Sequence, residues 1–177
     1  MIITNPLAWA YCDIYFNDGQ ELKDFTAEFD YKAVKKLDKS AYWIHGIFRN
    51  DWNNGISGVL FVGELGKLNC MIFVGGPNDQ QGKQEFPIRF NLNKWYYLKM
   101  EVDGSKLSVS IDGKLIADVD WSNLKILPDI GKVGLGAGGA EVHFDNFVIT
   151  GDEVPDSGMP VEPAGKLATR WGKLKAF

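Results

Sequence analysis

The chain has 177 residues and a formal net charge of -4, and hydrophobic residues make up 45% of it. This length suits one domain with a substantial core, and the acidic balance argues against nucleic acid as a partner, because phosphate binding needs a positive face. No apolar run reaches the length of about 18 residues that a membrane span needs. The start, Met1 to Pro6, lacks the basic, apolar and cleavage-site segments of a secretory signal. We therefore expect no membrane span and no signal peptide in this chain.

Short runs of alternating apolar and polar residues dominate the chain, and turns that contain glycine separate them. Period-2 alternation is typical of half-buried strands, so the pattern predicts an all-β, antiparallel sandwich. In chain order, we expect strands over 7–16, 25–34, 41–49, 57–63, 68–75, 85–90, 95–102, 106–111, 114–119, 131–137 and 141–150.

Two Asp-Gly pairs, Asp103-Gly104 and Asp112-Gly113, each separate two of these runs. Asp-Gly favours the positive φ angles of a tight type I′ turn, which predicts a three-stranded meander. On its first strand, alternate residues form a core face, and the opposite face is a mixed surface suited to solvent, a second layer or a ligand. That mixed face consists of Trp95, Tyr97, Lys99 and Glu101.

The composition changes after Gly151, where Pro155, Pro160 and Pro163 introduce linker chemistry. We expect a domain over 1–150, a linker over 151–165 and a basic-aromatic tail over 166–177. The tail has helix-like spacing of apolar residues around Trp171. It is predicted to form a short helix that either packs on the domain or docks to an anionic surface.

Cys12 and Cys70 both lie in apolar, strand-like runs, where a buried free thiol is common. A disulfide between them would need Cα atoms within about 7 Å of each other. The sequence leaves both states open.

Several stretches carry a family resemblance. They are DFTAEFDY at 24–31, GIFR at 46–49, NKWYYLKMEVDG at 93–104 with VSIDGK at 109–114, and GKVGL at 131–135 with FDNFVI at 144–149. Together they resemble the laminin G-like domains of the concanavalin A-like lectin and glucanase superfamily, including domains related to 3-keto-disaccharide hydrolases. The resemblance covers roughly residues 7–150 and implies a jelly-roll sandwich with lectin-like carbohydrate binding.

The resemblance also implies a secreted, periplasmic or cell-surface protein. Such domains usually begin with one or two further strands before the run equivalent to 7–16, so the start of this chain is expected to leave an open edge that favours self-association. They often hold a structural calcium ion near an Asp of the last strand, here Asp145. The alternative is that Asp145 and Asn146 bond to neighbouring backbone. We expect no other cofactor.

Enzymes on this fold resemble glucanases, which place two carboxylates on one strand face. Glu28 and Asp30 share a face and match best, but the third acidic position of the pattern is occupied by Lys32. Asp51 is a further acidic candidate. The alternative is that Glu28 and Asp30 lie on the solvent side of their strand, and no motif of nucleophilic hydrolases, nucleotide sites or zinc sites occurs.

Sugar binding needs aromatic surface for pyranose CH faces and a few fixed polar groups. The candidate ligand-binding residues are Trp43, His45, Arg49, Asp51 and Trp52. Ordinary packing of Trp43 is the alternative, and a second aromatic row around Asp13 and Tyr15 is either its neighbour or part of the core.

The leading hypothesis from the sequence is a non-catalytic recognition module that binds carbohydrate or a protein partner on a surface assembly. A glycoside-acting hydrolase and a structural or assembly component are the alternatives.

Overall fold

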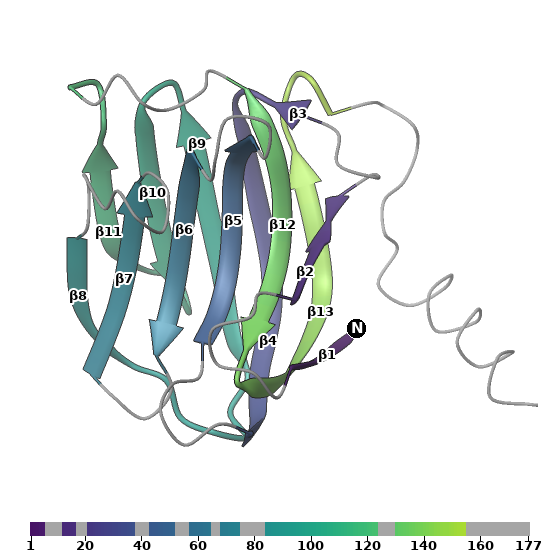
Figure 1. Ribbon diagram of the computed structural model, residues 1–177. Helices are drawn as coiled ribbons and strands as arrows, with labels where there is room; N and C mark the ends of the chain where they lie inside the picture. The colour runs from purple at the N-terminus through teal and green to yellow at the C-terminus, as the bar shows by residue number, and fades with distance from the viewer. Residues whose placement is uncertain are drawn as a thin grey trace, which may run out of the picture.

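The computed structural model describes the backbone of residues 1–5, 12–16, 21–37, 43–51, 57–64, 68–74, 84–123 and 130–154. Within these ranges the strands pair in antiparallel fashion into two sheets that face each other (Figure 1). Sheet A has the order β1 (Ile2–Asn5), β13 (Ala140–Thr150), β4 (Phe25–Lys36), β9 (Tyr96–Asp103), β10 (Lys106–Ile111) and β11 (Lys114–Asp120). Sheet B has the order β2 (Cys12–Tyr15), β12 (Gly131–Gly138), β5 (Trp43–Asp51), β6 (Ser57–Glu64), β7 (Leu68–Val74) and β8 (Gln84–Arg89), and β3 (Glu21–Leu22) also pairs with β12.

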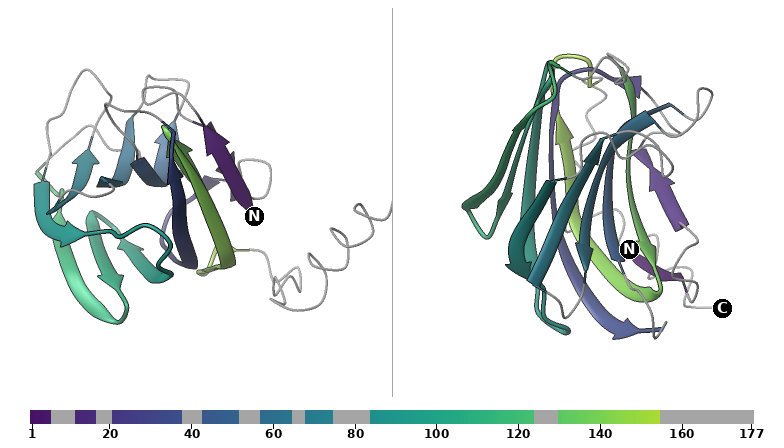
Figure 2. Two further views of the ribbon diagram at one scale, coloured as in Figure 1. Left: turned by 90° about the horizontal axis from the view of Figure 1, so that it is seen from below. Right: turned by 60° about the vertical axis from the view of Figure 1, so that its left-hand side comes forward.

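The core lies between the two layers, which Figure 2 shows from two further directions. Strand β4 illustrates how alternation builds it, because every second side chain from Phe25 to Ala33 is buried and those between are partly exposed. Phe29 is fully buried, and its ring centroid lies 6.0 Å from those of both Phe144 and Phe147 on β13. The predicted sandwich is confirmed.

Each of the eleven predicted runs contains a strand, whereas β1 and β3 were not predicted. Strand β3 has only two residues, and among Ile2, Ile3 and Thr4 of β1 only Ile3 is buried, so neither strand produces a visible period-2 pattern. Strand β1 pairs along β13, and the Met1 ammonium donates a hydrogen bond of 2.6 Å to the Phe144 carbonyl. The predicted run 7–16 is a strand over Cys12–Tyr15, and residues 6–11 lie outside the described ranges.

The two Asp-Gly hairpins form, but their turns differ. In the β10–β11 hairpin the two turn residues, Asp112 and Gly113, have φ of 51° and 76°, as a type I′ turn requires. In the β9–β10 hairpin Asp103 pairs with Lys106, so the turn residues are Gly104 and Ser105. Of these two only Gly104, at 55°, has positive φ, which is the pattern of a type II′ turn. The prediction of a type I′ turn is therefore wrong for the first hairpin.

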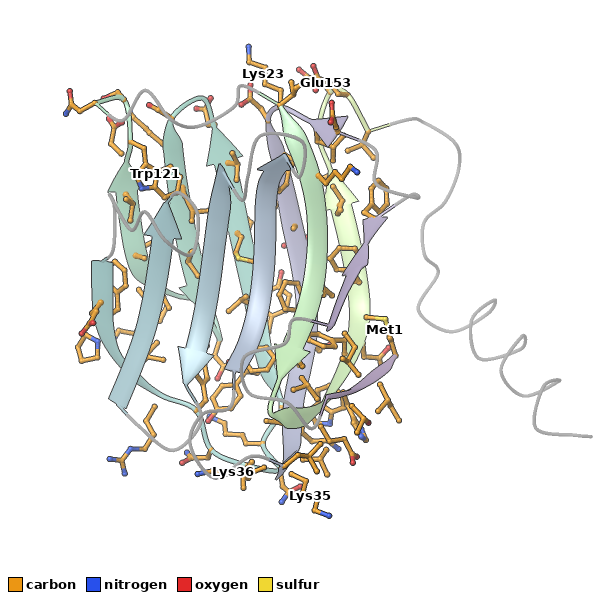
Figure 3. The ribbon with its side chains drawn as sticks, viewed as in Figure 1. Met1, Lys23, Lys35, Lys36, Trp121 and Glu153 are labelled. Carbon is orange, nitrogen blue, oxygen red and sulfur yellow. The ribbon has the colours of Figure 1, made fainter. Side chains whose placement is uncertain are left out.

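The chain packs against its own β3–β4 junction where it leaves β13. A Cβ added to Gly151 would lie 2.6 Å from the Asp24 carbonyl oxygen. The Lys23 amide donates a hydrogen bond of 2.8 Å to the Glu153 carboxylate, and these two residues lie together at one end of the sandwich (Figure 3). The predicted linker beyond Val154 and the predicted helical tail lie outside the described ranges.

The register separates the two cysteine positions. Cys12 lies on β2 and Cys70 on β7, with β12, β5 and β6 between them in sheet B. Neighbouring strands are about 4.8 Å apart, so the two positions are separated by about 19 Å. Because a disulfide requires Cα atoms within about 7 Å, this topology excludes a bridge between Cys12 and Cys70 within one chain.

Candidate functional site

The strand that carries most of the candidate ligand-binding residues, β5, lies inside sheet B between β12 and β6. On β12, Val133, Leu135 and Ala137 are buried in the core. The alternate positions Gly134, Gly136 and Gly138 pair with Ile47, His45 and Trp43. Because cross-strand partners share a face, the positions of Trp43, His45 and Ile47 belong to the outer face of sheet B.

A bulge interrupts β5 between Phe48 and Asp51. Such a bulge inserts a residue and re-aims the chain. Simple alternation, which placed Arg49 on the face of Trp43, therefore does not extend through this segment. Asp51 ends the strand opposite Ser57, and Trp52 lies outside the described residues.

The register also relates β5 to the second aromatic row. Strand β2 lies on the other side of β12, with Asp13 paired to Gly136 and Tyr15 paired to Gly134. The positions of Asp13 and Tyr15 therefore share the outer face of sheet B with those of His45 and Ile47. One strand separates the two rows, which corresponds to about 10 Å between the backbones of β2 and β5.

Glu28 and Asp30, the candidate catalytic pair, lie on the outer face of sheet A. Each carboxylate has a specific hydrogen-bond partner from a neighbouring strand. The Tyr97 hydroxyl of β9 donates to Glu28 Oε1, and the Asn146 side-chain amide of β13 donates to Asp30 Oδ2 at 2.6 Å. Both acids lie on the solvent side of their strand, as the alternative to a catalytic pair expected. Their catalytic role remains a hypothesis.

The contact with Glu28 changes the acidity of Tyr97. Ionisation would place a phenolate beside the carboxylate and remove the hydrogen bond, so the pKa of Tyr97 rises from 10.0 to about 12. Burial and the charges of Glu28, Asp30 and Glu101 act in the same direction. Tyr97 is consequently a neutral donor to Glu28 at neutral pH.

The contact between Asn146 and Asp30 was not predicted from the sequence. It sits in a bulge of β13 between Asp145 and Val148, opposite Asp30 and Glu28, and has a φ of 50°. Asn tolerates this left-handed conformation better than most residues. The Asp-Asn pair in the last strand was the signal that could have indicated such a bulge.

Asp145 itself offers only part of a calcium site. Its Oδ1 accepts a hydrogen bond of 2.9 Å from the backbone amide of Asn146, which fits the alternative that Asp145 bonds to neighbouring backbone. Its pairing partner across β4 is Asp30, which could supply a second carboxylate. In the part of the chain that the structure describes, no cluster of three or more His, Cys, Asp or Glu side chains is suited to a metal ion. These side chains do not by themselves fit calcium, and the ion stays a prediction.

The two stacked antiparallel sheets define a jelly-roll sandwich of the concanavalin A-like class. The chain belongs to the family of 3-keto-alpha-glucoside-1,2-lyase-like domains, whose model matches residues 10–150. This match confirms the resemblance seen in the sequence. A comparison with curated protein sequences finds no match.

Solved structures share the fold at low sequence identity. The carbohydrate binding module CBM66 from Bacillus subtilis has a TM-score of 0.60 and 21% identity, covering 75% of this chain and 78% of its own. Sheep galectin-11, solved with glycerol, has a TM-score of 0.57 and 9% identity, covering 84% and 99%. The Bacillus licheniformis beta-glucanase has a TM-score of 0.54 and 11% identity, covering 73% and 67%.

Among the described residues we find no helix with the length and apolar character of a transmembrane segment.

Proposed function

We propose that this chain is a non-catalytic recognition module that binds carbohydrate through the outer face of sheet B. The observation that carries the proposal is the position of β5, an interior strand whose Trp43 and His45 positions lie on that outer face. The names of structurally similar proteins, a carbohydrate binding module and galectins among them, support the ligand class. The candidate contacts are Trp43, His45, Arg49, Asp51 and Trp52.

These residue types have different roles in sugar recognition. Indole rings offer flat apolar surface to pyranose CH groups, while an imidazole, a guanidinium and a carboxylate exchange hydrogen bonds with hydroxyls. In the proposed site, Trp43 and His45 occupy positions in the middle of the outer face, because β5 is an interior strand of sheet B. Arg49 and Asp51 follow at the bulge, where a locally bent strand can direct polar groups toward a ligand.

Glycan-array screening of the wild type beside Trp43→Ala and Trp52→Ala tests this function. We expect the wild type to bind a defined set of glycans and each variant to lose signal on that same set. Thermal unfolding checks that the variants remain folded. If the wild type binds no glycan, the carbohydrate role fails, and a protein partner or an assembly role becomes the better explanation.

A glycoside-acting enzyme is the second candidate, because the family is named for a lyase that acts on 3-keto-alpha-glucosides. Glu28, Asp30 and Asp51 are the carboxylates that would serve as acid or base. Release of reducing sugar, abolished by Glu28→Gln, Asp30→Asn or Asp51→Asn, would establish this activity. Wild-type protein that releases no product from the glycans it binds would support the non-catalytic role.

The proposed setting is a secreted, periplasmic or cell-surface assembly, which is what the resemblance of the sequence to laminin G-like domains implies. Partner proteins and further copies of the chain are alternative ligands in that setting. Self-association would involve the outermost strand β1 of sheet A or the tail at 166–177.

A further inference from the structure

The outer face of sheet A carries two exposed aromatic residues that the proposed site on β5 does not use. Trp95 is 44% exposed and Tyr97 is 40% exposed. Trp95 immediately precedes β9, and Tyr97 is the second residue of that strand. The Trp95 ring lies beside the Lys32 ammonium, and Lys32 shares the outer face of β4 with Asp30, the register partner of Tyr97, so both rings border the same face. The core face of β9 is formed by the alternate residues, among them Tyr96, Leu98 and Met100, which are buried. Large rings at these two positions are therefore not required by the core.

Hydrogen-bonding groups lie beside both rings. Asp30 pairs in register with Tyr97 on one side and with Asp145 on the other, and its carboxylate accepts from the Asn146 amide at 2.6 Å. The Lys32 ammonium lies 4.7 Å from the centroid of the Trp95 ring. A carboxylate has about four lone-pair positions, so one accepted hydrogen bond leaves room for further donors such as sugar hydroxyls.

These groups are held in place before any ligand arrives. The Tyr97 hydroxyl is fixed by Glu28, and the Tyr97 backbone exchanges two hydrogen bonds with Asp112, of 3.0 Å and 2.8 Å. Asn146 is fixed by the bulge of β13 that gives it a φ of 50°. Affinity gains from such preorganisation because less side-chain freedom is lost on binding.

We propose that Trp95, Tyr97, Glu28, Asp30 and Asn146 form a second glycan-binding surface, here called the sheet A platform. Its ligand is a neutral sugar chain whose CH faces stack on the rings and whose hydroxyls bond to the carboxylates and the amide. The face carries the carboxylates of Glu28, Asp30, Glu101 and nearby Asp145 against the ammonium groups of Lys32 and Lys99, and this excess of negative charge disfavours an anionic polysaccharide. The proposal shares the ligand class of the proposed function but not its site.

The platform and the β5 site lie on the two outer faces of one sandwich, which point in opposite directions (Figure 2). A ligand on one face therefore leaves the other face accessible. One domain can hold two polysaccharide chains at once, and a long polysaccharide with many binding positions becomes cross-linked.

Native gel electrophoresis in the presence of barley β-glucan, galactomannan, xylan or dextran measures binding, and turbidity of mixtures measures cross-linking. We expect wild type to be retarded and to produce turbidity with at least one of these neutral polysaccharides. Trp95→Ala should abolish the turbidity and weaken binding by about tenfold in a Trp43→Ala background, where only the platform remains. Leu115→Ala is the matched control, because Leu115 is 57% exposed and its register partner Ser110 pairs with Lys99 on the same face.

Two further variants separate lost recognition from lost folding. Trp95→Phe keeps a ring and should retain most of the binding, whereas Asp30→Asn keeps the size of the side chain and should weaken it. The proposal is overturned if Trp95→Ala matches the Leu115→Ala control in both assays. Loss of all binding in Trp43→Ala, with Trp95→Ala unaffected, would overturn the platform and leave the β5 site standing. Loss of all binding in Trp95→Ala, with Trp43→Ala unaffected, would support the platform alone. Absence of wild-type binding to all four polysaccharides would overturn the platform.

Discussion

Replacing Gly151 by alanine should destabilise the domain although the residue lies just beyond the last strand. Its added Cβ would meet the Asp24 carbonyl oxygen at 2.6 Å and the Phe25 Cα at 3.2 Å. Both atoms belong to the backbone, so no side-chain rotation relieves the clash, and the end of β13 must move away from β4. That movement also weakens the hydrogen bond from the Lys23 amide to Glu153.

Overpacking of this kind costs about 1 to 3 kcal/mol, and a weakened hydrogen bond adds about 0.5 to 1.5 kcal/mol. We expect Gly151→Ala to lower the free energy of unfolding by about 2 to 3 kcal/mol, which for a domain of this size lowers Tm by about 4 to 12 °C. Thermal unfolding followed by circular dichroism measures this shift.

Gly104 provides the matched comparison. A Cβ there has no neighbour within 4 Å, but the residue has a φ of +55°. Gly104→Ala should therefore cost about 1 kcal/mol through backbone strain alone, and Gly104→Asn should cost less because Asn tolerates positive φ. Gly151→Asn should be as destabilising as Gly151→Ala, because its Cβ meets the same backbone atoms. A Tm for Gly151→Ala within about 1 °C of wild type would refute the steric reasoning.

Three further predictions concern ionisation, calcium and assembly. Tyr97 should ionise near pH 12, and Glu28→Gln should return its midpoint toward 10, as phenolate absorbance would show. Because the folded state keeps the Tyr97 proton longer than the unfolded state, its contribution to stability is complete below pH 10 and is lost between pH 10 and 12; an unchanged midpoint in Glu28→Gln would contradict this account. If calcium binds at Asp145, adding it after chelator treatment should raise Tm in calorimetry, and an unchanged Tm would contradict the prediction of a calcium site. If the tail mediates assembly, deleting residues 152–177 should reduce the particle mass in light scattering, while equal masses would exclude that role.

The fold was predictable because the core repeats one simple rule along the strands. In β4 and β9 every second residue is buried, and that alternation is visible in the sequence. The rule fails where the backbone departs from regular pairing. The turn at Gly104 and Ser105 depends on which residues pair across the hairpin, and that register follows from the partner strand, not from the Asp-Gly dipeptide.

The candidate sites were predictable only in part, for the same reason. Alternation placed Glu28 and Asp30 on the outer face of sheet A, but their partners Tyr97 and Asn146 come from strands distant in sequence. Tight turns indicate which consecutive strands pair, but the pattern of a single sequence does not show which strands distant along the chain become neighbours. The Asp145-Asn146 pair could have indicated a bulge, but the contact of Asn146 with Asp30 depends on the register of β13 with β4, which the sequence does not show.

The order of sheet A also constrains how the chain can fold during synthesis. Strand β4 is synthesised early, but its two neighbours in the sheet, β9 and β13, are synthesised much later. Strand β1 also pairs with β13 and cannot pair until β13 has been synthesised. Until residues near 150 leave the ribosome, both β1 and one edge of β4 lack their partner. Within sheet A, the meander of β9, β10 and β11 needs only local contacts and can close first, because short loops cost less entropy to close. Complete folding is therefore expected to follow synthesis, with the exposed edges of β1 and β4 as the segments most open to chaperones and to misassociation in the interval.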